Sequence, residues 1–256
     1  MRSISVVMPA LNEQENIGKA IRDVLGGFSA FAIDGELVLV DDGSSDKTSE
    51  IMKEYLSLHP GKIKLIRHEK PRGIGASFWD GVKKAEKDAV VMMPGDAEND
   101  AAEILKYLGL MEQVDIIVPY VVNKEMRGLS RNIISGAFLS IINISFGLSL
   151  NYTNGTVVYR RAIFDDIKCM ETGFFYQVEA LVKSIRKGYI FAEVPCLLSK
   201  RSAGESKAIG FKSLLKVLKA YFRLYREIYI TKTHLARKSF VPTSVAFRIR
   251  ENNGQE

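Results

Sequence analysis

The chain has 256 residues, of which 46% are hydrophobic and 26% are charged. This length suits one α/β domain of ordinary size, and the composition is that of a globular protein and excludes a disordered chain. The net charge of +6 is uneven, because residues 199–256 contain 13 Lys and Arg against 4 Asp and Glu. That basic end predicts an anionic partner. No zinc-binding or RNA-binding pattern is present, so we expect a membrane surface or phosphate groups and no nucleic acid.

Short apolar runs alternate with helical patterns in the first half of the chain. Asn12 with Glu15, and Asp100 with Glu103, have the spacing of a capping box, which predicts that helices begin there. The alternation predicts a mostly parallel sheet flanked by helices. Ligands bind such sheets at the carboxyl ends of the strands, so we expect a site after strands one, two and four. The expected strands are 4–8, 36–40, 62–67, 89–93 and 115–118, and the expected helices are about 13–25, 44–58, a segment after 75, and 100–110.

The second half is less regular and ends in a basic amphipathic helix at 211–230. This helix carries Lys and Arg among Leu, Val, Phe and Tyr, which is typical of a helix lying on an anionic membrane. A helix docked on the protein with a solvated face has the same pattern. We expect a main domain at 1–210 and a helical extension at 211–256. The other expected elements are helices at 127–150 and 174–187 and strands at 154–159 and 189–195.

No membrane-spanning segment is predicted. Residues 133–150 are rich in Ile, Leu and Phe but are interrupted by Ser and Asn, and a span needs about 20 mostly apolar residues. A core helix or a membrane-surface helix fits better. Because no N-terminal signal peptide is visible, we expect a cytoplasmic protein, peripheral on the cytoplasmic face of the membrane or attached to a membrane subunit.

Two acidic clusters follow predicted strands. Asp41 and Asp42 end the second strand within residues 40–46 (Val-Asp-Asp-Gly-Ser-Ser-Asp), where a carboxylate can accept bonds from a base N–H or a ribose hydroxyl. Asp96 and Glu98 follow the fourth strand and, being two residues apart, can point the same way. Carboxylates there can hold Mg²⁺ or Mn²⁺ against a diphosphate. A turn with helix caps would also explain parts of both clusters, and it is the better explanation for Asp100.

These clusters and several other segments together resemble glycosyltransferase family 2. Residues 6–13 (Val-Val-Met-Pro-Ala-Leu-Asn-Glu), 40–46 and 94–100 carry the resemblance in the first half. Residues 174–179, 188–195 and 201–207 (Arg-Ser-Ala-Gly-Glu-Ser-Lys) are similar to the dolichyl-phosphate mannosyltransferase branch. The resemblance covers about residues 3–210. It implies a GT-A fold, which is Rossmann-like, and a nucleotide-sugar-dependent hexosyltransferase.

The resemblance also implies roles for particular residues. Metal and diphosphate would be bound by Asp96 and Glu98, and donor and acceptor phosphates by Arg131, Arg201 and Lys207. Arg and Lys suit phosphate, although a solvated basic loop would explain Arg201 and Lys207 as well. Glu179 is a candidate base if the acceptor is a hydroxyl, and otherwise a helix residue that holds a loop. The nucleoside would be held by Pro9, Leu11, Glu13, Val40, Asp41 and Asp42.

Two positions depart from the family pattern. The family has Asp-x-Asp in the loop after strand four, but Pro94 stands at the first Asp and cannot bind metal. The family's Ser-Arg after strand five is replaced by residues 118–120 (Val-Pro-Tyr). Glu98 could compensate for Pro94, or the metal site could be weaker or displaced.

The implied reaction is an inverting transfer of a sugar from a GDP- or UDP-linked donor to a polyprenyl phosphate. A phosphate acceptor is already an anion, so no strong base is needed, and catalysis depends on alignment and on stabilising the leaving diphosphate. Two alternatives remain open. One is a family 2 transferase that acts on a saccharide hydroxyl, and the other is a non-catalytic nucleotide-sugar-binding protein.

Overall fold

The computed structural model describes residues 3–123, 129–153, 155–197, 211–231 and 240–253. Its centre is a seven-stranded sheet in the order β3-β2-β1-β4-β6-β5-β7. β6 is antiparallel to β4 and β5, and the other neighbours are parallel. This confirms the mostly parallel α/β sheet. The strands are β1 (Ser3–Ala10), β2 (Asp34–Asp41), β3 (Ile63–Arg67), β4 (Ala89–Met92), β5 (Ile116–Val121), β6 (Val158–Arg160) and β7 (Phe191–Cys196).

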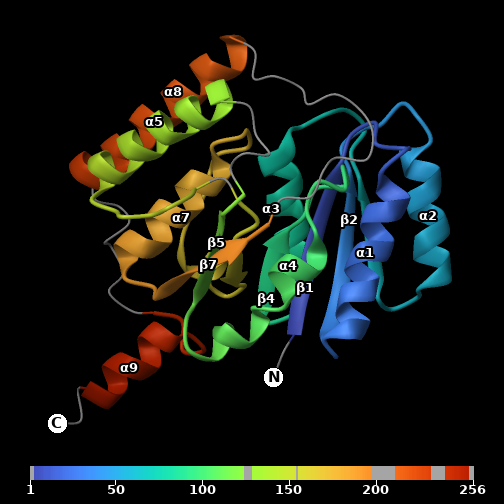
Figure 1. Cartoon of the computed structure of the whole chain (residues 1–256), viewed down its shortest axis with the longest axis horizontal. Helices are drawn as coiled ribbons and strands as arrows, with labels where there is room; N and C mark the ends of the chain where they lie inside the picture. The colour runs from blue at the N-terminus through green and yellow to red at the C-terminus, as the bar shows by residue number, and fades with distance from the viewer. Residues whose placement is uncertain (1–2, 124–128, 154, 198–210, 232–239, 254–256) are drawn as a thin grey trace.

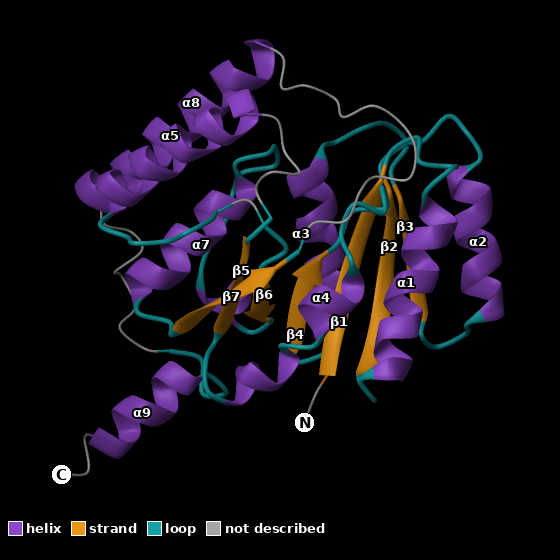
Figure 2. Cartoon of the chain, in the orientation of Figure 1, coloured by secondary structure: helices purple, strands orange, loops and turns teal. Residues whose placement is uncertain are grey.

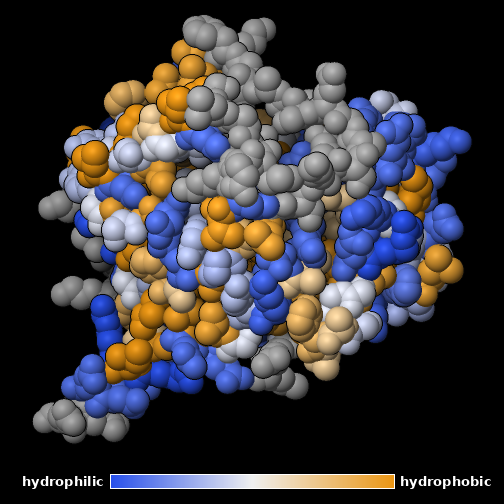
Figure 3. Space-filling model, viewed as in Figure 1, coloured by the Kyte–Doolittle hydropathy of each residue, from blue (hydrophilic) through white to orange (hydrophobic). Residues whose placement is uncertain are grey.

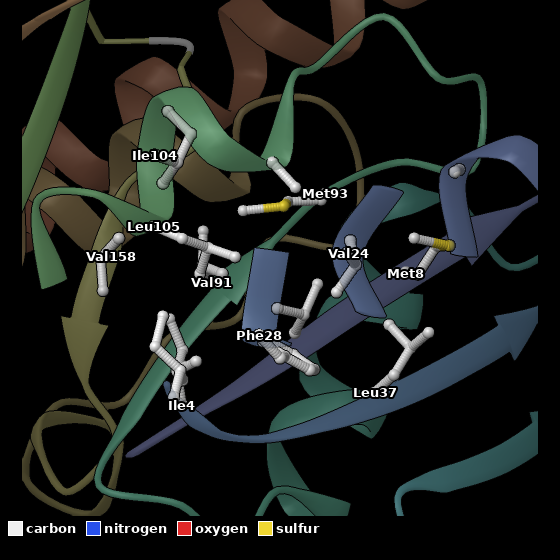
Figure 4. Close-up of a cluster of buried hydrophobic side chains, with 14 of the residues drawn as sticks. Ile4, Met8, Val24, Phe28, Leu37, Val91, Met93, Ile104, Leu105 and Val158 are labelled. Atoms are coloured by element: carbon white, nitrogen blue, oxygen red, sulfur yellow. The ribbon is translucent and has the colours of Figure 1, made fainter. Parts of the chain in front are cut away.

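Helices cover both faces of the sheet (Figures 1 and 2). On one face, α1 and α4 pack over Ile4 and Met8 of β1, whose side chains are fully buried (Figure 4). On the other face, α3 and α7 pack over Val7 and Val38. Parallel strands covered on both sides are apolar throughout, which explains the continuous apolar runs in the sequence. These helices are α1 (Ile17–Ala30), α2 (Thr48–Leu58), α3 (Ile74–Lys84), α4 (Ala101–Leu105), α6 (Ile163–Asp166) and α7 (Tyr176–Lys187).

A separate helical layer lies beyond α7. α5 (Leu129–Phe146) and α8 (Phe211–Arg226) pack side by side (Figure 1), and they share a third apolar cluster with α7 that includes Phe146, Val182 and Leu224. α8 continues into a π-helical turn at Glu227–Thr231. Among the described residues, no helix is long and apolar enough to cross a membrane.

The chain returns to the sheet after this layer. α9 (Val245–Asn253) begins against β5, where Asp115 accepts the backbone N–H groups of Val245 and Ala246 at 2.6 and 3.0 Å. Phe240 and Ala246 belong to the same core as Val7. Segments on both sides of residue 210 therefore share hydrophobic cores, and the division into two parts stays a prediction.

The predicted start of the first helix is wrong. α1 begins at Ile17 and not near Glu13. A single turn, in which the Glu13 carbonyl accepts the Ile17 N–H at 2.8 Å, leads into the helix, and residues 12–14 also bind the segment after β2. Asn12 has a positive φ of 56° and accepts the N–H of Ser45 at 2.9 Å. Glu13 donates its N–H to Thr48 at 2.8 Å. The polar side chains that resembled a cap join the loops after β1 and β2.

The predicted cap at Asp100 is confirmed. Its carboxylate accepts the N–H of Ala102 at 2.9 Å at the start of α4. A capping box would also have the Glu103 carboxylate accept the backbone N–H of Asp100. Instead, that carboxylate binds Lys106 and accepts the N–H of Leu197.

Candidate active site

A cavity of about 580 Å³ opens at the carboxyl ends of β1, β2 and β4. This is the position that the strand pattern predicted for a ligand. Three predicted segments meet in its wall. Pro9, Leu11 and Glu13 come from the end of β1, Asp42 follows β2, and Asp96 follows β4. Residues up to 87 positions apart thus form one surface because parallel strands end at the same edge.

Asp42 is buried and is held by groups from one neighbouring loop. One carboxylate oxygen accepts the His68 Nδ1–H at 2.7 Å and the Arg72 N–H at 2.8 Å, and the other accepts the Gly73 N–H at 2.9 Å. Gly43 makes the turn that follows, with φ of 82°, and a Cβ there would lie 2.8 Å from the Lys70 carbonyl carbon. These bonds fix the carboxylate at the cavity wall.

The turn after β4 presents Asp96 to the cavity. The half-buried Asp96 accepts the N–H of Glu98 at 3.1 Å, and Ala97 between them has a positive φ of 56°. Glu98 is half-buried and does not line the cavity. Because Ala97 has a positive φ and Asp96 accepts the N–H of Glu98, this segment is a turn and not the extended loop that was expected.

Another part of the cavity wall is the loop at residues 171–175. The carbonyl of Thr172 accepts the N–H groups of Gly75 and Ala76 at 2.9 and 3.2 Å. The carbonyl of Glu171 accepts the Trp79 indole N–H at 2.8 Å. A Cβ at Gly75 would lie 2.7 Å from the Thr172 carbonyl carbon, so the start of α3 can approach the loop only with glycine there.

Glu179, in α7, holds this loop through backbone hydrogen bonds. Its carboxylate is 2% exposed and accepts the N–H groups of Met170 and Glu171 at 3.0 and 2.7 Å. It also pairs with the buried Lys183 at 2.8 Å. Burial alone lowers the pKa of Lys183, but the charge of Glu179 and hydrogen bonds to Glu179 and Glu227 outweigh it and raise that pKa. Glu179 does not line the cavity, so its position agrees with a loop-holding role.

Other predicted residues lie behind the cavity or outside the described residues. Val40 and Asp41 are fully buried and do not line it. Asp41 accepts the N–H of Ser44 at 2.8 Å and lies 3.4 Å from the Arg67 guanidinium. Arg201 and Lys207 fall in residues 198–210, outside the described part of the chain, and of Arg131 only the backbone, in α5, is described.

Several cavity residues were not predicted as site residues. Arg72 and Gly73 follow β3, Thr172 precedes α7, and Lys216 and Val217 belong to α8. Of these residues, only Lys216 belongs to a feature that the sequence analysis singled out, the basic amphipathic helix at 211–230. Nothing in the sequence indicates that this helix reaches a cavity built from residues 9–96.

The described residues contain no group of three or more His, Cys, Asp or Glu side chains that could hold a metal by themselves. Mg²⁺ commonly binds through one or two carboxylates together with substrate phosphates and water. Asp96 offers one such carboxylate in the cavity. The residues therefore fit a divalent cation that arrives with a diphosphate, rather than a metal held by protein ligands alone.

The same fold occurs in a known class of enzymes. Glucosyl-3-phosphoglycerate synthase from Mycobacterium tuberculosis, in complex with Mn²⁺, UDP-glucose and phosphoglyceric acid, superposes with a TM-score of 0.66 over 88% of this chain and 80% of that one, at 18% identity. Its complex with Mg²⁺ and UDP gives a TM-score of 0.65. The sheet and the cavity thus define a GT-A fold.

The chain belongs to glycosyl transferase family 2, whose model matches residues 5–168. Dolichol-phosphate mannosyltransferase from Pyrococcus furiosus is 27% identical over 231 residues, covering 87% of this chain and 64% of the relative. Undecaprenyl-phosphate 4-deoxy-4-formamido-L-arabinose transferase from Salmonella paratyphi A is 26% identical, covering 85% and 66%. Dodecaprenyl-phosphate galacturonate synthase from Rhizobium johnstonii is 26% identical, covering 65% and 50%. The chain spans between half and about two thirds of these relatives.

Proposed function

We propose that this chain transfers a sugar from a nucleoside-diphosphate donor to a polyprenyl phosphate, with inversion at the anomeric carbon. The observation that carries the proposal is the convergence of Glu13, Asp42 and Asp96, from three strand ends, on one cavity. Membership of family 2 supports the reaction class, and relatives named for polyprenyl-phosphate substrates support the acceptor.

The proposed step is a single displacement. An oxygen of the acceptor phosphate forms a bond to the anomeric carbon, and the bond from that carbon to the donor diphosphate breaks. The nucleoside diphosphate leaves with the electron pair. Because the acceptor phosphate is an anion near neutral pH, no protein base has to remove a proton. The buried, fully engaged carboxylate of Glu179 agrees with this mechanism.

Each wall of the cavity would have its own task. The fixed carboxylate of Asp42 would orient the nucleoside, and the loop at 171–175 would face the acceptor. A divalent cation, Mg²⁺ or Mn²⁺, would be bound by the carboxylate of Asp96, in the turn that also contains Glu98, and would neutralise charge on the diphosphate. Uridine and guanosine donors both enter the test below.

The acceptor requires access to lipid, and we propose that α5 and α8 lie on an anionic membrane surface. Apolar side chains gather over these two helices (upper left of Figure 3). Residues 199–256 carry 13 Lys and Arg against 4 Asp and Glu, which favours the anionic cytoplasmic leaflet. Side chains on this surface with 44–83% exposure include Ile133, Ile134, Ile141, Ile144, Leu214, Leu215, Leu218, Phe222 and Ile230.

A transfer assay with matched acceptors tests the function. The purified chain is first screened by thermal shift against GDP, UDP and their sugars, with and without Mg²⁺ or Mn²⁺, because a ligand that binds only the folded state raises Tm. The stabilising donors are then incubated with undecaprenyl phosphate in vesicles or with an oligosaccharide. We expect a lipid-linked sugar and a released nucleoside diphosphate. Transfer to the oligosaccharide alone, or donor binding without any product, would refute the proposed acceptor or the proposed activity.

A further inference from the structure

α8 has two different faces. Ala220 and Leu224, together with Ile228 of the π-helical turn that follows, are buried against α5 and α7. Leu214, Leu218 and Phe222, spaced at one turn, are 48%, 44% and 64% exposed on the outer face. Solvent-facing helical surfaces are normally polar, so an outer apolar stripe indicates a surface that contacts apolar material.

Lys216 lies in the cavity wall, on the same helix that carries the outer apolar stripe. It lines the cavity together with Val217, whereas its neighbour Leu215 is exposed. Lys216 makes no hydrogen bond or ion pair with the protein in the part of the chain that the structure describes. Arg72, the other described cation in the cavity wall, is bound to Asp80 at 2.6 Å.

The position of Lys216 is fixed by polar contacts further along the same helix. Arg223, seven residues on and therefore about two turns away on the same side, binds Glu171 in the cavity loop at 2.7 Å. Glu227 binds the buried Lys183 at 2.9 Å. These pairs hold the helix against the loop that Glu179 also holds, and they keep the backbone of Lys216 beside the cavity.

We propose that Lys216 binds the phosphate of the lipid acceptor, an inference that rests on the proposed transferase function. In a polyprenyl phosphate the phosphate is attached directly to the isoprenoid chain. A cation that binds this phosphate must therefore lie in the cavity and close to an apolar surface. Lys216 lines the cavity from the helix that carries the apolar stripe, and the exposed Phe174 lines the same cavity. The same cavity is lined by Glu13, Asp42 and Asp96, whose carboxylates would repel the acceptor phosphate if no cation were beside it.

The expected kinetic effect is on acceptor binding. A lysine that neutralises the phosphate stabilises the bound acceptor as well as the transition state, and such uniform binding changes KM rather than kcat. Loss of one charge-assisted hydrogen bond weakens binding by about 10-fold.

The test compares Lys216→Gln with Lys219→Gln, which removes the same charge from an exposed position outside the cavity wall. Geranyl phosphate in solution serves as acceptor, so that no bilayer is involved. Binding is followed by the fluorescence of Trp79, the only tryptophan, whose indole contacts Glu171. Lys216→Arg tests whether a cation suffices.

We expect Lys216→Gln to raise both the Kd and the KM for geranyl phosphate about 10-fold, with unchanged donor KM and unchanged Tm. Lys219→Gln should match the wild type, and Lys216→Arg should retain most of the affinity. Wild-type affinity in Lys216→Gln, or a loss of donor binding instead, would overturn the inference. If the wild type binds geranyl phosphate through Lys216 yet transfers no sugar, the proposed function fails while the phosphate site stands.

Discussion

The buried carboxylate of Glu179 accepts the backbone N–H of Glu171 at 2.7 Å, and the side chain of Glu171 binds Arg223 of α8 at the same distance. One acidic residue in α7 thus positions the cavity loop, and that loop positions α8. The chain of contacts joins the helical layer that we propose meets lipid to the cavity that we propose binds the donor.

Glu179→Gln should separate a loop-holding role from that of a general base. The amide keeps an acceptor for the loop N–H groups but loses the charge that pairs with the buried Lys183. Breaking a buried pair costs about 3–5 kcal/mol, so we expect a lower Tm and a lower kcat/KM. A loop-holding residue leaves the shape of the pH–rate profile unchanged. Loss of the acidic limb of that profile would instead identify Glu179 as the base.

Asp96→Asn should abolish most turnover without unfolding the chain. Asp96 is half-buried and offers the carboxylate of the β4 turn to the cavity. Removing one group that stabilises developing charge lowers kcat by about 100-fold or more. Asp100→Asn is a matched control in the same turn, because Asn also caps helices well and Asp100 does not line the cavity. Equal activity of the two variants would argue against Asp96 as the cation-binding carboxylate.

The strands were predictable because a parallel sheet covered on both faces requires nearly continuous apolar runs, such as residues 37–40 within β2. The position of Asp42 and Asp96 in one cavity wall was predictable because the topology places the ends of parallel strands at one edge, whereas Asp41 and Glu98 do not line that cavity. The start of α1 was not, since Asn12 resembles a cap but binds Ser45 across a loop that only the folded chain creates. Lys216 was not predicted as a cavity residue, because its place depends on tertiary contacts at Arg223 and Glu227.

Acid should destabilise the fold partly through Glu36, which lies away from the cavity. Burial alone raises the pKa of this carboxyl, but hydrogen bonds from Lys64, Ser5 and the Glu86 backbone outweigh it and lower the pKa below 4.5. A lowered folded-state pKa stabilises the protein above the unfolded value, and that stabilisation is lost as the pH falls through the folded value.

Glu36→Gln should therefore be less stable than the wild type at pH 7 by about 1–3 kcal/mol, and the difference should shrink below about pH 4. Urea unfolding of both proteins at pH 7 and below about pH 4 measures this difference in unfolding free energy. Glu54→Gln, an exposed change on α2, is the control and should lower stability at neither pH. A constant difference between Glu36→Gln and the wild type across this range would contradict the assigned pKa shift.

Asp115 should be essential for docking α9. It is fully buried and accepts N–H groups of Val245 and Ala246, and it pairs with Arg160 at 3.1 Å. Asp115→Ala leaves Arg160 and two backbone donors without their acceptor, so we expect a loss of about 3–5 kcal/mol of unfolding free energy. Hydrogen exchange should show faster exchange at the first amides of α9.

The control for Asp115 is Asp165→Ala, which removes an exposed carboxylate 3.7 Å from Arg161. Surface pairs contribute about 0–1 kcal/mol, so this variant should unfold almost as the wild type does. If Asp115→Ala were equally mild and the amides of Val245 and Ala246 stayed protected, the segment after residue 240 would be held by its apolar contacts at Phe240 and Ala246 rather than by this carboxylate.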